Sequence, residues 1–176
     1  MEKKSSAMVV SLGYSVIIAL ASVVLSLILY LLNLDQNKAL SILSYIVLFG
    51  GILLAQLNYR NKYMGGYVTF AQAFSIGLWI SLFLSIIMGI YTFVFFKYIN
   101  PGAMEEAMVI AEQEMMNQGM TDLQIEQGMA IAQKFASVGY YTIIAVVANF
   151  FLGLVFSLIT SIFVKKEGTG FDQPSN

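Results

Sequence analysis

Methionine and acidic residues crowd one stretch of the chain, "EEAMVIAEQEMMNQGMTDLQIEQ", which runs from Glu105 to Gln127. Thioethers bind Cu(I), and Met104 and Met108 are spaced so that one turn of a helix would place both sulfur atoms on the same face. The chain has no cysteine and no histidine to accompany them, and methionine is also a flexible filler of irregular apolar gaps. The sequence therefore favours packing over a metal site, and we predict no metal.

The carboxylates of the same stretch raise a second chemistry, the binding of Ca²⁺. An EF-hand collects its oxygen ligands at fixed positions of one short loop. The acids here follow no such spacing and are spread along two predicted helices: Glu105, Glu106, Glu112, Glu114, Asp122 and Glu126. A solvated acidic face is the better interpretation, and we predict no cofactor.

Catalytic chemistry has little support elsewhere in the chain. General acid–base or nucleophilic work at a membrane site needs histidine, cysteine or a carboxylate buried among helices. Every Asp, Glu, Lys and Arg lies outside the long apolar segments, so we predict a protein that is not an enzyme and has no catalytic residues. The basic residues flank these segments without forming a patch, which excludes nucleic acid as an expected partner.

The elements that position these residues are apolar helices. The 176 residues are 59% hydrophobic and 11% charged, against about 45–50% apolar residues in soluble domains. About 20 helical residues cross a bilayer, and a crossing segment must satisfy its backbone internally. Four apolar segments without charges meet these demands: residues 8–32, 39–57, 70–96 and 140–164.

These segments predict an all-α fold, an integral membrane four-transmembrane-helix bundle in a single membrane domain of residues 1–166. The partner of such a bundle is the lipid bilayer. The polar residues 167–176 are expected to form a disordered cytoplasmic tail.

An amphipathic helical hairpin is predicted between the third and fourth segments, at about residues 101–136. Pro101 suits the first helical position, Gly119 suits a helix stop, and Thr121 with Gln124 forms a capping box that restarts the helix. Each arm carries an apolar stripe at helical spacing: Met104, Met108, Ala111 and Met115, then Ile125, Met129, Ala132 and Ala136. We expect these stripes to lie against the bundle or the lipid headgroups, with the acids in water.

Small residues spaced four apart mark the faces on which the long helices should pack, because helices in lipid associate through close approach and interhelical hydrogen bonds. The first segment carries Ser15, Ala19, Ser22 and Ser26, and its stripe should meet the other two near the bundle axis. The helix-packing candidates are Gly77, Ser81, Ser85 and Gly89 on the third segment and Asn149, Gly153 and Ser157 on the fourth.

Three amides lie within or beside these segments. We expect Asn149 to make a structural interhelical hydrogen bond, in preference to lining a pore or a substrate site. Gln56 and Gln72 are placed near the cytoplasmic ends of their segments, where water should reach them. None of the three is predicted to carry chemistry.

The basic residues predict the orientation. Six fall on one side of a four-span arrangement: Lys3, Lys4, Arg60, Lys62, Lys165 and Lys166. Three fall on the other: Lys38, Lys97 and Lys134. The positive-inside rule then places both termini in the cytoplasm and the acidic hairpin on the outer side.

Several stretches resemble a known bacterial family. They are "MEKKSSAM", "LAQLNYRNKYMGGYVTFAQAF", "YTFVFFKYINPG" and "GMTDLQIEQGM", and they are similar to the family catalogued as domain of unknown function 4199. The resemblance covers essentially residues 1–166. It implies a small four-span protein of the bacterial inner membrane with the hairpin in the periplasm, and it brings no catalytic residues and no assigned function.

Two functions remain as hypotheses. The first is a non-catalytic membrane interaction or accessory protein, whose acidic hairpin meets a protein partner, a second copy of the chain or the periplasmic headgroup surface. The alternative is a passive channel or permease for a small solute, assembled as an oligomer and lined by Ser, Thr and Asn149. Narrow helices packed on small residues leave little lumen, which favours the first hypothesis.

Overall fold

A computed structural model describes residues 7–34 and 37–166. The predicted tail of residues 167–176, like Lys3 and Lys4, lies outside the described residues. The described part is helical apart from its turns and one bridge between Val68 and Lys166, which confirms the all-α prediction. The elements are α1 (Ala7–Leu31), α2 (Lys38–Asn58), the π-helix η1 (Tyr59–Tyr63), α3 (Phe70–Val94), the π-helix η2 (Phe95–Ile99), α4 (Ala103–Asn117), α5 (Asp122–Phe135) and α6 (Val138–Val164).

Four helical runs in the described residues are long and apolar enough to cross a membrane, as a multi-pass membrane protein requires. They are Ala7–Leu31, Ile42–Tyr63, Phe70–Ile99 and Val138–Val164. The second run extends past residue 57, the predicted end of its segment, because η1 continues α2 without a break. The continuation carries Arg60 and Lys62, two of the basic residues from which the orientation is predicted.

The chain forms two compact units, and the predicted single domain of residues 1–166 extends over both. Of the described residues, the helical unit consists of 7–34, 37–87 and 148–166, and the hairpin unit of 88–147. The first holds α1, α2, the start of α3 and the end of α6. The second holds α4, α5 and the helical ends that lead into them.

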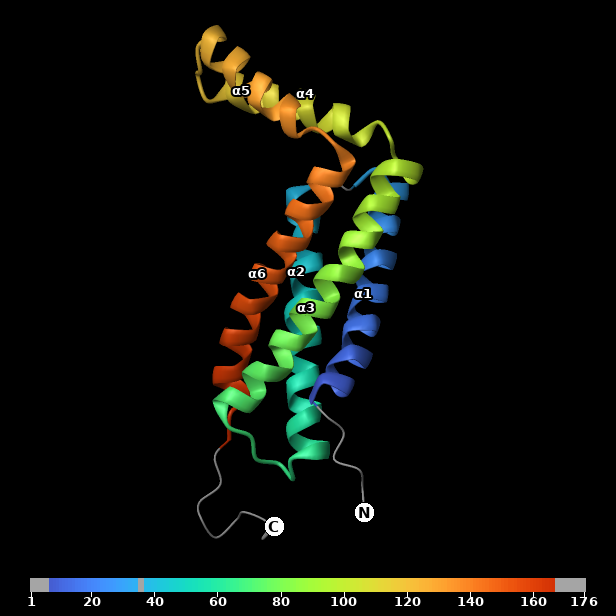
Figure 1. The fold of residues 1–176 in the computed structure, drawn as a ribbon, viewed down its shortest axis with the longest axis vertical. Helices are drawn as coiled ribbons and strands as arrows, with labels where there is room; N and C mark the ends of the chain where they lie inside the picture. Colours follow the sequence, from blue (N-terminus) through green and yellow to red (C-terminus); the bar gives the residue numbers. More distant parts are fainter. Residues whose placement is uncertain (1–6, 35–36, 167–176) are drawn as a thin grey trace. The chain divides into compact units, whose positions relative to one another are not determined.

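Within the helical unit the long helices lie side by side (Figure 1), with α2 and α3 in contact with both outer helices. Gly51 of α2 lies against the Ile18 side chain of α1. The rings of Phe49 in α2 and Phe156 in α6 meet edge to face, with centroids 5.6 Å apart. The contacts of α3 with α1 and α6, given below, complete this arrangement.

One end of the helical unit gathers the start of α3 and the end of α6. Val68 and Lys166 exchange both backbone hydrogen bonds at 2.9 Å. The Arg60 Nη1 donates to the Val164 carbonyl at 3.1 Å, where a cation complements the negative end of the α6 dipole. The turn before α3 begins at Met64, because Asn61–Tyr63 belong to η1.

The hairpin unit folds through the local signals that its sequence carries. Gly119 ends α4 with a φ of +73°, a left-handed conformation that glycine adopts without a Cβ penalty. The Thr121 and Gln124 capping box begins α5, as predicted. The predicted start of α4 is wrong by two residues, because Pro101 and Gly102 form a turn that closes with the Ala103 N–H on the Asn100 carbonyl at 3.2 Å.

The apolar stripes of α4 and α5 face each other. Met115 of α4 packs over Gly128 of α5, with its Sδ and Cε atoms 3.1 Å from the position that a Cβ on Gly128 would occupy. Ile125 is the buried residue of α5. Within the hairpin unit these stripes close the hairpin, and their contact with the bundle or the headgroups stays a prediction.

Candidate functional site

The close approach of α3 and α6 is built on glycine and serine. A Cβ added at Gly153 would lie 2.8 Å from the Ser81 Cβ and 3.3 Å from the Ser81 Cα. A Cβ added at Gly77 would collide with the Ser157 side chain. Four of the predicted packing residues thus meet in one interface, which we call the α3–α6 seam: Gly77, Ser81, Gly153 and Ser157.

The other packing candidates lie outside this seam. Ser85 is buried on α3, and its Oγ donates within its own helix to the Leu82 carbonyl at 2.8 Å. Gly89 lies in the hairpin unit, where a Cβ would collide with the Val146 side chain of α6. Asn149 is half-buried on α6 and does not belong to the fully buried polar set.

The serine face of α1 meets α3 from the other side. The Ser11 Oγ donates to the Ile76 carbonyl at 3.2 Å, and the Ser15 Oγ lies 2.7 Å from the Ser11 carbonyl and 3.4 Å from the Ile80 carbonyl. These serines are fully buried. Their hydroxyl groups donate hydrogen bonds to main-chain carbonyl oxygens. The helices α1 and α3 can therefore approach closely without leaving a hydroxyl donor unpaired.

Gln56 lies near the end of α2 and is buried in the helical unit, so the expectation that water reaches it is wrong. Its side chain is 1% exposed. From α2 its Nε2 donates to the Ala73 carbonyl at 3.1 Å and to the Ser161 Oγ at 3.0 Å, and it lies 3.5 Å from the Ser157 Oγ. Gln56 thus joins α2, α3 and α6 through one amide.

Spacing along α2 carries a signal for this burial. Leu48, Ile52 and Ala55 are buried, and Gln56 follows at one-turn spacing on the same face. Gln72, by contrast, is exposed as predicted. Its Oε1 accepts from the Thr69 N–H at 3.0 Å, which completes a second capping box at the start of α3.

The carboxamide oxygen of Gln56 is buried without a hydrogen-bond partner in the described part of the chain. The orientation of the amide follows from the Ala73 carbonyl, because a reversed amide would bring two oxygen acceptors together. A buried unpaired acceptor costs about 1–3 kcal/mol. The groups that Gln56 contacts are serine hydroxyls and a main-chain carbonyl, which suit hydrogen bonding between helices.

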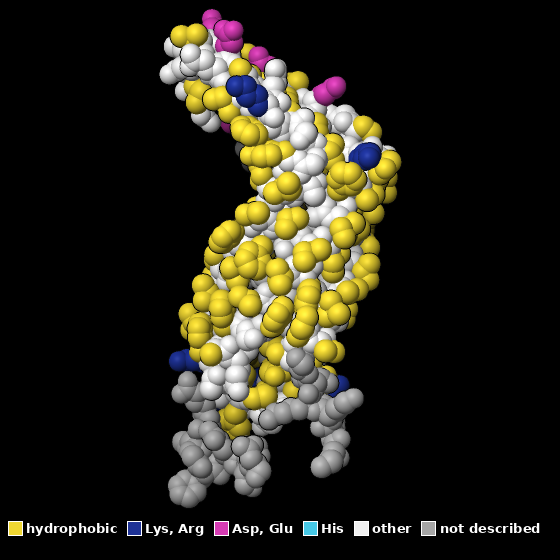
Figure 2. Space-filling model, in the orientation of Figure 1, with side chains coloured by type: hydrophobic (Ala, Val, Ile, Leu, Met, Phe, Trp, Pro, Cys, Tyr) yellow, Lys and Arg dark blue, Asp and Glu magenta, His cyan; other side chains and the backbone are white. Residues whose placement is uncertain are grey.

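The outer surface of the hairpin is the second feature that stands out. Large hydrophobic side chains are exposed on it although α4 and α5 are not among the candidate membrane spans: Val109, Ile110, Met116, Met120, Leu123, Ile131 and Phe135. Acidic side chains lie between them, and on the face in Figure 2 the magenta carboxylates gather over α4 and α5. We call this mixed face the hairpin surface.

The protein-family model described as "Protein of unknown function (DUF4199)" matches residues 13–166. Neither the curated proteins nor the solved structures contain a significant match to this chain.

Proposed function

Because the chain belongs to the DUF4199 family, which assigns no activity, we propose its function from its own surface: a non-catalytic membrane interaction or accessory protein. The observation that carries this proposal is the exposure of large apolar side chains on the hairpin surface. Val109 is 52% exposed and Ile131 is 58% exposed, one on each arm. Groups of large exposed apolar side chains among polar ones are typical of protein interaction sites.

Lipid explains the exposed side chains of the long helices but not those of the hairpin. The helices α4 and α5 have 15 and 14 residues, below the roughly 20 that cross a bilayer. They also carry six carboxylates, from Glu105 to Glu126. A surface of this mixed character fits a protein partner better than a hydrocarbon interior.

The charge of the hairpin surface indicates the chemistry of the partner. Residues 103–135 carry six carboxylates and one basic residue, Lys134, so the hairpin is net negative. A partner segment with lysine or arginine around an apolar centre complements this surface, since charge complementarity directs partner choice and speeds association. The proposed occupant is therefore a basic, apolar-faced segment of another protein.

The α3–α6 seam supports an accessory role over a passive channel. Gly77 and Gly153 bring the two helices so close that a single methyl group would collide. Gln56 joins α2, α3 and α6 by hydrogen bonds. Packing of this kind holds helices together and leaves no lumen along the seam.

We place the protein in the bacterial inner membrane with both termini in the cytoplasm and the hairpin in the periplasm. Arg60 and Lys62 of η1 and Lys165 and Lys166 after α6 support this orientation, since the Val68–Lys166 bridge and the Arg60 contact bring them to one end of the helical unit. Basic residues near span ends favour the cytoplasmic side.

Single cysteines introduced into this cysteine-free chain test the orientation directly. In intact spheroplasts, Gln118→Cys in the hairpin should react with a membrane-impermeant maleimide. Asn61→Cys in η1 should react only after the membrane is permeabilised. The reverse pattern, with Asn61→Cys reacting first, would refute the orientation.

Photocrosslinking tests the interaction. A photoreactive phenylalanine analogue at Val109 or Ile131 should give protein adducts of defined mass in native membranes, and mass spectrometry should identify the same partner from both positions. The same analogue at Ile17, which is 63% exposed on the apolar helix α1, serves as the lipid-facing control and should give no protein adduct.

Charge reversal supplies the specificity control. Glu106→Lys combined with Glu126→Lys, both exposed on the hairpin, should reduce the adduct yield severalfold, because like charges then face the basic partner. Adducts with lipid alone, or only with a second copy of the chain, would contradict the proposed partner. The passive channel would then be examined by conductance in a planar bilayer.

A further inference from the structure

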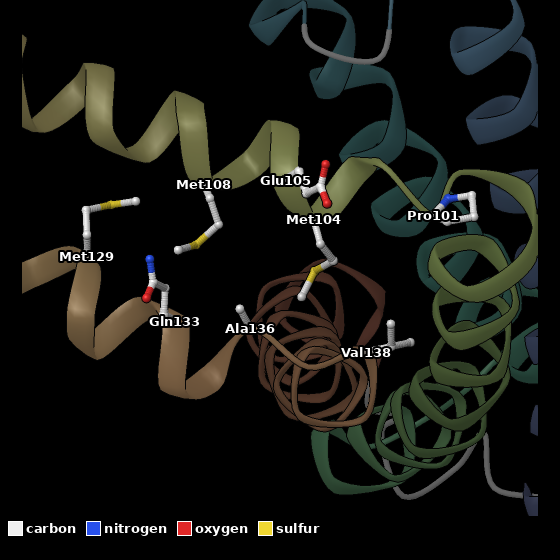
Figure 3. A pocket seen from close by; sticks show the side chains of 8 residues that line it. All are labelled: Pro101, Met104, Glu105, Met108, Met129, Gln133, Ala136 and Val138. Atoms are coloured by element: carbon white, nitrogen blue, oxygen red, sulfur yellow. The ribbon is translucent and has the colours of Figure 1, made fainter.

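Three thioethers line one pocket of the hairpin unit. Met104 and Met108 come from α4 and Met129 from α5, and their side chains enter the space between the two helices (Figure 3). The pocket has a volume of about 450 Å³, and its remaining lining residues are Pro101, Glu105, Gln133, Ala136 and Val138. The sequence pairs Met104 with Met108, and the structure adds Met129 from the opposite arm.

These methionines border an open space, which distinguishes them from methionines that fill a gap. Met115 is the contrasting case in the same hairpin, because its Sδ and Cε atoms occupy the hollow left by Gly128. Met104, Met108 and Met129 are each half-buried around the pocket. Their long unbranched side chains have the rotamer freedom to bring three sulfur atoms together around one small ligand.

The chemistry of this lining selects the ligand. Thioether sulfur is a soft neutral donor that favours Cu(I), whereas Zn²⁺ takes thiolate, imidazole or carboxylate ligands, and Ca²⁺ and Mg²⁺ take oxygen ligands. The Glu105 carboxylate beside the pocket compensates the positive charge of a bound cation. The other carboxylates of the hairpin raise the local concentration of cations.

We propose that Met104, Met108 and Met129 form a binding site for one Cu(I) ion between the two arms of the hairpin. The site requires no oxidation or reduction by the protein, because the metal enters and leaves as Cu(I). It is independent of the proposed protein partner, whose surface lies on the outer side chains of the same helices. Binding would join α4 to α5 through coordinated sulfur.

The full chain in detergent, titrated with Cu(I) under anaerobic reducing conditions against a chromophoric Cu(I) chelator, tests the proposal. We expect one Cu(I) per chain and sulfur scatterers around the copper in X-ray absorption spectra. Zn²⁺ should not compete. No binding, or a coordination shell of oxygen and nitrogen alone, would overturn the site.

Methionine-to-leucine variants locate it, because leucine conserves volume and preserves the packing of the hairpin. Met108→Leu and Met129→Leu should each weaken Cu(I) binding by at least about tenfold, and the variant with all three positions changed should bind none. Met116→Leu and Met120→Leu are matched controls on exposed positions of the same hairpin and should bind like the original protein. Equal loss in these controls would reject the assignment. Circular dichroism of each variant checks that the helices persist.

Discussion

Gln56→Glu is expected to lower the free energy of unfolding by about 3–5 kcal/mol, the cost of leaving a buried charge uncompensated. The substitution changes one atom group of the side chain, the NH₂ to an oxygen. That oxygen would face the Ala73 carbonyl and would take away the donor that now reaches Ser161. Thermal unfolding in detergent, followed by the fluorescence of the single tryptophan, Trp79, measures the loss.

Gln72→Glu is the matched control, since it makes the same chemical change at an exposed position. The Gln72 Oε1 accepts from the Thr69 N–H, and a carboxylate oxygen accepts equally well at a helix N-terminus, so stability should change by at most about 0.5 kcal/mol. Gln56→Leu should lower the free energy of unfolding by less than Gln56→Glu. Leucine introduces no charge and no unpaired donor, and it removes the Gln56 Oε1 that has no hydrogen-bond partner. Equal losses for all three variants would show that the amide of Gln56 does not join the helices.

Gly153→Ala is expected to destabilise the protein by about 1–3 kcal/mol, the usual cost of overpacking a filled interior. The added methyl group would lie 2.8 Å from the Ser81 Cβ and 3.3 Å from the Ser81 Cα. The second of these atoms belongs to the backbone of α3, so a change of rotamer cannot relieve the contact and the helices must separate. The same unfolding measurement reports the loss.

Gly50→Ala tests whether the loss comes from the seam or from glycine itself. Gly50 lies inside α2 with nothing within 4 Å of an added Cβ, so alanine there should be neutral or stabilising by up to about 1 kcal/mol. Combining Gly153→Ala with Ser81→Gly should recover part of the loss, because the two positions share one contact. Strictly additive losses in the double variant would argue against the contact.

The membrane-spanning helices could be predicted because hydropathy and length decide them before any packing is known. Residues 70–96 and 140–164 were predicted, and the structure has apolar runs at Phe70–Ile99 and Val138–Val164. The cap of α5 at Thr121 and the stop of α4 at Gly119 were equally accessible. Each depends on interactions within a few residues of sequence.

The seam could be predicted in part. Spacing alone placed Gly77, Ser81, Gly153 and Ser157 on two stripes, and the structure brings these four together. The position of Gln56 along its helix suggested contact with water, and only the partners 101 and 105 residues later in the chain reveal its role. Hydrogen bonds over such distances leave no local pattern.

For the hairpin, the sequence predicted the helices but not the contacts between them. Its helices follow from caps and periodicity, but an amphipathic pattern does not specify which surface the apolar stripe will contact. The helices α4 and α5 pack against each other where Met115 lies over Gly128. The periodicity within each helix does not specify this contact between the two. The pocket that Met129 shares with Met104 and Met108 was hidden for the same reason.

The contacts of Gln56 also determine the order in which the protein can be completed during synthesis. Gln56 on α2 and its partner Ala73 on α3 are synthesised within 17 residues of each other. Ser157 and Ser161 follow 101 and 105 residues after Gln56. The whole hairpin is translated in the interval. Until α6 leaves the ribosome, the glycine and serine face of α3 has no α6 to pack against, so the contacts of the seam form only after α6 is made.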